Sequence, residues 1–175
     1  MNREQLEHLI RAAGGVLGEE TVIVLGSQAI LASFPDGLPA PAVISLEADF
    51  LPLDDPDEAK ADRIAGDLGE GSPFQEQYGI YADGVGQHTA RLPAEWRERL
   101  VLLKNENTNG VTALCLEPHD LIISKLLANR PKDLHYCRAL LEAGYVKATT
   151  LRERIPYTDA TETERTRITD FLQSY

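Results

Sequence analysis

Two short polar stretches of the chain carry residue types that could hold a metal-bound phosphate group. Gly26-Ser27 directly follows Thr21–Leu25, an apolar, β-branched run that predicts a buried strand. A glycine lets the backbone approach a phosphate closely, and the serine hydroxyl and the following N–H groups can donate hydrogen bonds to it. Glu47 and Asp49 alternate along a second predicted strand, so both carboxylates point to one side and could bind Mg²⁺. Taken alone, each stretch also has an ordinary structural interpretation: Ser27 as a helix N-cap, and the two acids as the solvated face of a strand.

A third polar stretch begins with Asp120 and ends with the sequence Arg130-Pro-Lys132-Asp133. Lys125 lies within it on a predicted helix. Two ordinary interpretations remain open. Lys125 could be a surface residue at the edge of an apolar helix, and Asp133 falls in the first turn of the next helix, where the helix dipole favours any acid.

Together these stretches resemble a known superfamily. The order of elements is similar to that of the polymerase-β nucleotidyltransferases: a strand, Gly26-Ser27, a helix, a loop, and a second strand with the Glu47/Asp49 pair. The stretch from Asp120 to Asp133 resembles the minimal nucleotidyltransferases that act as toxins of type IV toxin–antitoxin pairs, the AbiEii/MenT kind. Two features depart from the superfamily pattern: the Pro-rich loop at 35–41 lengthens the first gap, and Glu47 stands where aspartate is more common.

The resemblance implies a Mg²⁺-dependent transfer of a nucleotide from an NTP to an acceptor hydroxyl. The metal ligands would be Glu47, Asp49 and Asp83, and the NTP phosphates would bind to Gly26, Ser27, Lys125 and Arg130. Catalytic roles would fall to Glu47, Asp49, Lys125 and Asp133. The acceptor would be a tRNA 3′ end or a protein, and an antitoxin would be a partner.

Two other functions stay open at this stage. The chain could be a catalytically inactive nucleotidyltransferase fold that serves as a binding or regulatory protein, as the glutamate at position 47 would allow. It could also be a plain interaction domain with solvated acids. That last alternative predicts that Glu47 and Asp49 lie far from Lys125 in the folded protein.

The pattern of apolar residues predicts an α/β (α+β) fold, a small mixed sheet with helices packed on it. We expect a single nucleotidyltransferase-like domain over 1–175, with a sheet core at about 20–116 and a helical part at about 117–175. Strands are expected at 21–25, 43–51, 78–82, 97–103 and 112–116, with a turn at Asp83-Gly84. Helices are expected at 3–17, 28–34, 56–68, 118–130, 131–141, 149–155 and 160–173.

Composition excludes several classes of partner. The net charge of −11 disfavours non-specific binding to DNA and binding to an anionic membrane surface. Cys115 and Cys137 have neither zinc-ligand nor disulfide spacing, so both are expected as buried free thiols, which fits a reducing cytoplasm. No signal peptide and no apolar run of about 20 residues is present, so a cytoplasmic protein is expected. The four histidines lack metal-ligand spacing and receive no role.

Overall fold

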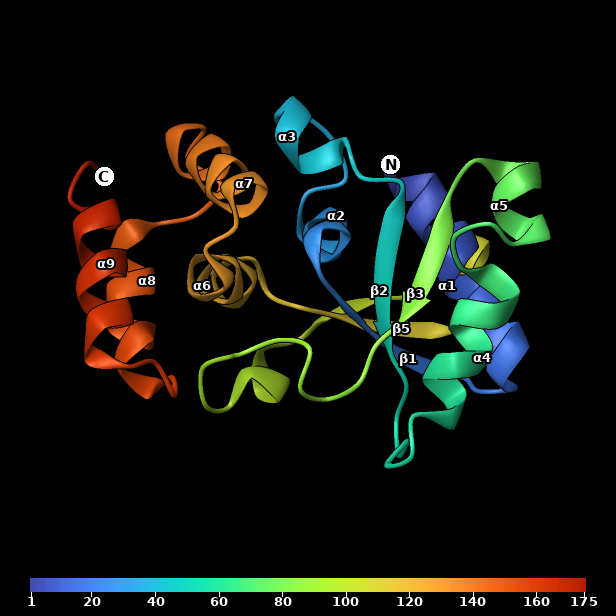
Figure 1. The fold of residues 1–175 in the computed structure, drawn as a ribbon. Helices are drawn as coiled ribbons and strands as arrows, with labels where there is room; N and C mark the ends of the chain where they lie inside the picture. The colour runs from blue at the N-terminus through green and yellow to red at the C-terminus, as the bar shows by residue number, and fades with distance from the viewer.

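The computed structural model describes residues 1–175, and its centre is a mixed five-stranded sheet covered by helices (Figure 1). The expected α/β class is therefore confirmed. The strands are β1 (Thr21–Leu25), β2 (Glu47–Leu51), β3 (Tyr81–Gly84), β4 (Val101–Leu103) and β5 (Thr112–Cys115). The helices are α1 (Arg3–Leu17), α2 (Ile30–Ser33), α3 (Ala40–Val43), α4 (Ala59–Leu68), α5 (Pro73–Tyr78), α6 (Pro118–Ala128), α7 (Pro131–Glu142), α8 (Ala148–Arg154) and α9 (Glu162–Leu172). Short 3₁₀ helices are η1 (Ser27–Ala29), η2 (Trp96–Arg99), η3 (Glu106–Thr108) and η4 (Ile155–Tyr157).

The sheet has the strand order β3-β2-β1-β5-β4, with β1 in the centre. β1 runs antiparallel to β2 and parallel to β5, while β2 and β3 are parallel. Residues 22–25 of β1 are all buried, as expected for a central strand of continuous apolar residues. The antiparallel pairing of β1 with β2 is what brings the end of β1 beside the acidic strand.

Helices cover the sheet from two sides. In Figure 1, α1, α4 and α5 lie on one side of the strands, and α6 to α9 form a group on the other side. The helical spacing of Leu6, Leu9, Ile10 and Ala13 predicted the buried face of α1, and all four residues are fully buried. No helix of the structure is both long and apolar enough to cross a bilayer.

Both cysteines are free thiols inside the apolar core, as expected. Burial raises the pKa of Cys115 and of Cys137 to about 12. Neither thiol is therefore a nucleophile at neutral pH, and their packing role is the one that the sequence predicted.

The boundaries of the two strands that carry acids differ from the expectation. The strand predicted at 43–51 begins only at Glu47, because the residues from Ala40 to Val43 form the helical turn α3 with Pro41 in its first turn. The turn expected at Asp83-Gly84 was wrong, since both residues pair with β2 inside β3. A local Asp-Gly signal is overridden here by pairing with a strand more than 30 residues away in sequence.

Helices also differ from the expectation. α4 begins at Ala59 rather than at residue 56, because both Asp55 carboxylate oxygens accept hydrogen bonds from the Lys60 and Ala61 N–H groups. α5 was not expected; the Ser72 side chain caps it. α6 ends at Ala128 rather than at residue 130, with Asn129 in the left-handed conformation at its C-cap.

Candidate active site

Three carboxylates from two neighbouring strands lie together at one end of the sheet. Glu47 and Asp49 are on one face of β2, and the parallel register places Asp83 of β3 directly beside Asp49. One carboxylate oxygen from each of the three residues lies within 4.8 Å of the others. Ala48 and Phe50 point to the opposite face of β2 and are fully buried. The core packing of those two residues therefore fixes the direction of the acids.

The carboxylate cluster is electrostatically strained without a cation. Burial, and then the negative charges of Glu47 and Asp83, raise the pKa of Asp49 to about 6. The Tyr81 hydroxyl donates a 3.4 Å hydrogen bond to Glu47, but no positively charged group forms an ion pair with the three acids within 4.0 Å. An all-oxygen donor set that concentrates negative charge fits Mg²⁺, which prefers carboxylate ligands.

Gly26 lies against the Asp49 side chain. Leu25 is paired with Asp49 across β1 and β2, so the chain turns directly in front of the acid. Gly26 adopts φ of 62°, and a Cβ atom on it would lie 1.6 Å from Asp49 Oδ2. Only glycine satisfies both the positive φ and this approach, and the Gly-Ser turn and the acidic pair therefore meet.

The helical part supplies a cluster of two cations around one acid. Lys125 of α6 donates a hydrogen bond of 3.0 Å to Asp133 of α7, and Arg130 donates one of 2.5 Å to the other carboxylate oxygen. Asp133 is only 1% exposed. Burial alone would raise its pKa, but the hydrogen bonds from Arg130 and Lys125 outweigh burial and lower it. Two positive charges against one negative charge leave this cluster with net positive charge.

Tyr136 connects the two halves of the site, and the sequence analysis did not identify it. Its hydroxyl donates a 2.7 Å hydrogen bond to the Ser27 carbonyl oxygen, and the Lys125 ammonium lies 4.6 Å from the centre of its ring. The side chain is 3% exposed. The helical spacing could have identified Tyr136, because it follows Asp133 by three residues and therefore lies on the same face of α7.

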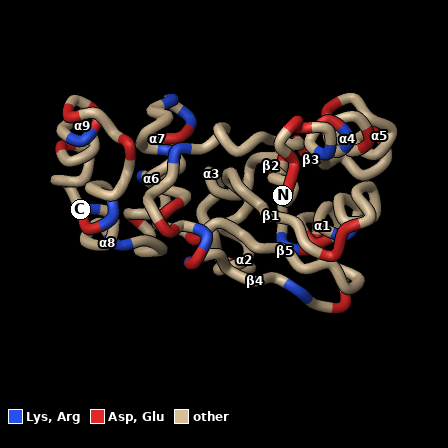
Figure 2. The backbone as a smooth tube through the Cα atoms, turned by 90° about the horizontal axis from the view of Figure 1, so that it is seen from below, with Lys and Arg blue, Asp and Glu red and all other residues tan.

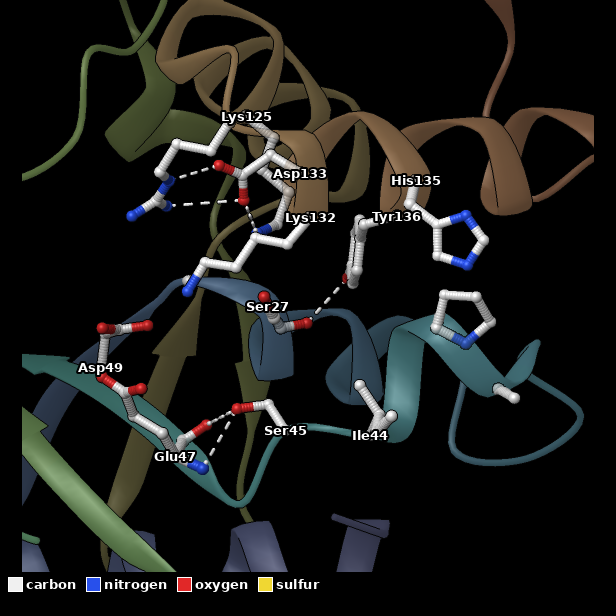
Figure 3. Close-up of a pocket in the computed structure, with 14 residues that line it drawn as sticks. Ser27, Ile44, Ser45, Glu47, Asp49, Lys125, Lys132, Asp133, His135 and Tyr136 are labelled. Carbon is white, nitrogen blue, oxygen red and sulfur yellow. Dashed lines mark hydrogen bonds and ion pairs between the residues drawn. The ribbon is translucent and has the colours of Figure 1, made fainter.

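Every candidate site residue predicted from the sequence, except Asp83, lines one cavity of about 630 Å³ together with Tyr136 (Figure 3). Asp83 contacts the cluster from the neighbouring strand but does not line the cavity. In Figure 3, Lys132 extends from α7 toward the side of the cavity that holds Ser27 and Asp49. The cavity is lined by Gly26, Ser27, Glu47, Asp49, Lys125, Arg130, Lys132, Asp133, His135 and Tyr136, together with Ala40, Pro41, Ile44 and Ser45.

The shared cavity contradicts the alternative in which the acids lie far from Lys125. The sequence-predicted candidates converge on this cavity. The lining residues to which the sequence gave no role are Ala40, Pro41, Ile44, Ser45, Lys132, His135 and Tyr136. His135 follows Lys132 by three residues on α7, so the helical period again carried the signal. No sequence pattern indicated Ile44 and Ser45, since they lie in the part of the expected strand 43–51 that does not form a strand.

A comparison with known families agrees with this arrangement. A family model described as "Nucleotidyltransferase of unknown function (DUF6036)" matches residues 4–175. The match includes the sheet and the C-terminal helices, and thus both groups of site residues. Neither a curated protein nor a solved structure matches the chain. The finer resemblance to AbiEii/MenT-type toxins is not confirmed by the family match and stays a prediction.

Proposed function

The chain belongs to this family of nucleotidyltransferases of unknown function, and from that premise we propose that it transfers a nucleotide from an NTP to an acceptor hydroxyl with the help of Mg²⁺. The single observation that carries the proposal is the shared cavity. It joins the clustered acids Glu47 and Asp49 to the cations Lys125 and Arg130, which gives a metal-binding side and a phosphate-binding side within reach of one triphosphate.

In the proposed reaction the chain binds and orients the triphosphate. Gly26 allows a phosphate close to the backbone, the Ser27 hydroxyl donates to it, and Lys125 and Arg130 neutralise its charge. Asp133 holds the two cations in place and keeps Lys125 extended toward the cavity. Preorganised charges of this kind stabilise the transition state, since they need no rearrangement when charge develops on the leaving pyrophosphate.

Glu47, Asp49 and Asp83 would hold the metal. When bound, Mg²⁺ would activate the acceptor hydroxyl and offset charge on the phosphates. The raised pKa of Asp49 supports this role, because a cation would remove the repulsion that raises it. Glutamate at position 47 is compatible with the same geometry, since its carboxylate reaches the cluster with the two aspartates.

The resemblance to toxin nucleotidyltransferases extends the proposal to a biological role. A tRNA 3′ end or a protein would be the acceptor, and an antitoxin would neutralise the activity. Expression of the wild type and of variants at Glu47 and Asp49 in a host tests this extension. Growth arrest that requires Glu47 and Asp49 supports a toxin, and normal growth at high expression contradicts one.

Transfer of label from each α-labelled NTP, with Mg²⁺, to total RNA and to protein tests the proposed activity. Label that appears with the wild type and disappears in Glu47→Gln and Asp49→Asn supports it. No transfer to either acceptor would overturn it. Calorimetry then tests the inactive alternative. A binding protein of this fold takes up NTP without Mg²⁺ dependence. The proposed enzyme binds NTP more tightly with Mg²⁺, because the acids would hold the metal that contacts the phosphates.

A further inference from the structure

A second, smaller cavity of about 160 Å³ adjoins the first and shares four residues with it. Both cavities are lined by Gly26, Asp49, Lys125 and Arg130. The remaining lining of the smaller cavity differs completely from that of the larger one, since it includes no residue of α3 or α7. It consists mainly of Thr89, Ala90, Leu116, Leu121, Ser124 and Ala128. The candidate metal- and phosphate-binding groups therefore lie where the two cavities meet.

In phosphoryl transfer, two cavities that meet at the phosphate-binding groups can hold the acceptor and the leaving group separately. The attacking and leaving oxygens lie roughly in line on the two sides of the reacting phosphorus. The larger cavity holds the exposed cationic side chain of Lys132 and has room for an NTP. The smaller one has about a quarter of the volume of the larger one, so the nucleotide is expected in the larger cavity. The acceptor is thus expected on the smaller side.

Resting on the proposed function, we propose that the acceptor is a serine, threonine or tyrosine side chain of a protein, and that it reaches the α-phosphorus through this smaller cavity. A bond forms between the acceptor oxygen and the α-phosphorus, and the bond from that phosphorus to the bridging oxygen of the β-phosphate breaks. Pyrophosphate leaves through the larger cavity, and the hydroxyl proton passes to bulk water. The product is a protein carrying a nucleoside monophosphate on oxygen.

The lining of the smaller cavity fits such a side chain. Leu116, Leu121 and Ala90 provide an apolar wall for the aliphatic or aromatic carbon atoms. Thr89 and Ser124 add two hydroxyl groups that can orient the acceptor oxygen. No aromatic side chain lines the cavity, so a nucleobase at an RNA 3′ end has no stacking partner there.

Charges around the smaller cavity also disfavour RNA. Its cations Lys125 and Arg130 are both paired with Asp133. An adjoining cavity, which shares Leu25 and Ala90, is lined by Arg91, whose guanidinium is paired with Asp159 and Glu164. Figure 2 shows Lys and Arg interspersed with Asp and Glu along the chain rather than gathered in a continuous stretch. An incoming RNA backbone would therefore find no unpaired cation in the smaller cavity, whereas Lys132 lines the larger one.

Filling the smaller cavity tests the proposal. Ala128→Phe places a ring at its edge, and Ala143→Phe is the matched control, because Ala143 is exposed at the C-cap of α7 and lines neither cavity. Ser124→Leu is a second filling variant. The probes are short peptides with one Ser, Thr or Tyr, and a single-stranded RNA oligonucleotide with a free 3′-hydroxyl. Calorimetry measures Mg²⁺–NTP affinity in each variant.

We expect label on a peptide and none on the RNA. Ala128→Phe and Ser124→Leu should lower peptide labelling at least about tenfold, equal to about 1.4 kcal/mol in the barrier, while NTP affinity and Ala143→Phe stay as in the wild type. RNA labelling in preference to peptide, unchanged labelling in both filling variants, or Mg²⁺–NTP binding with no labelled peptide overturns the acceptor proposal. Absence of NTP binding in the wild type overturns the proposed function instead.

Discussion

Replacing Asp49 by asparagine should stabilise the metal-free protein while it abolishes transfer. The pKa of Asp49 rises from 3.8 to about 6 in the fold, which corresponds to roughly 3 kcal/mol against the ionised form. Asparagine has the same shape and no charge. Because the site is open to water, which screens part of the repulsion, we expect a net gain of ~1–2 kcal/mol at pH 8 without metal. For a chain of this length that raises Tm by roughly 3–6 °C.

The pH dependence of this gain has a defined sign. Well below pH 3.8, Asp49 is protonated in both the folded and the unfolded wild type, so the two proteins should be equally stable. As the pH rises through 6, the wild type loses stability, because its folded form holds the proton more tightly than its unfolded form does. The advantage of Asp49→Asn should therefore appear between about pH 4 and pH 6 and stay constant above that range.

Urea unfolding at pH 4.5 and pH 8, in EDTA and with Mg²⁺, measures this prediction. Free Mg²⁺ at ten times its dissociation constant should stabilise the wild type by about 1.4 kcal/mol, and the variant by much less. Asp133→Asn is the opposite control, because it leaves Lys125 and Arg130 without their carboxylate and should cost roughly 3 kcal/mol at neutral pH. Destabilisation of the metal-free protein by Asp49→Asn, or an equal effect at both pH values, would contradict a repulsive cluster at Asp49.

Three further changes have expected outcomes of their own. Tyr136→Phe should lower the free energy of unfolding by about 1–2 kcal/mol, because the Ser27 carbonyl loses its hydrogen-bond donor. It should also raise KM for the NTP more than it lowers kcat, and an unchanged KM would contradict the bridging role. Gly26→Ala forces a Cβ onto Asp49 at a positive φ, so calorimetry should find weakened Mg²⁺ binding in a protein destabilised by at least ~1 kcal/mol, and normal metal affinity would count against the contact. Lys125→Met preserves most of the apolar contacts and should weaken affinity for Mg²⁺–tripolyphosphate by about tenfold or more, whereas an unaltered affinity would remove Lys125 from the phosphate site.

Some features of this protein follow from the sequence alone because their physical causes are local. The helical spacing of apolar residues predicts the buried face of α1, and short apolar runs predict strands β1 and β5. Alternation along β2 correctly gives the common direction of Glu47 and Asp49. The length of β2 is different, since α3 replaces the first part of the expected strand. A proline-rich segment can extend or turn, and packing against distant residues selects between the two.

Contacts between distant segments were decided only by the tertiary structure. The Asp-Gly pair at 83–84 predicted a turn, but pairing with β2 makes it a strand and carries Asp83 to the acids. Nothing local to Tyr136 reveals that its hydroxyl would bond to Ser27, 109 residues earlier. The sequence determined which residue types could bind a metal and a phosphate. Their assembly around one cavity depends on strand pairing and on the packing of α6 and α7, whose energies arise between parts of the chain far apart in sequence.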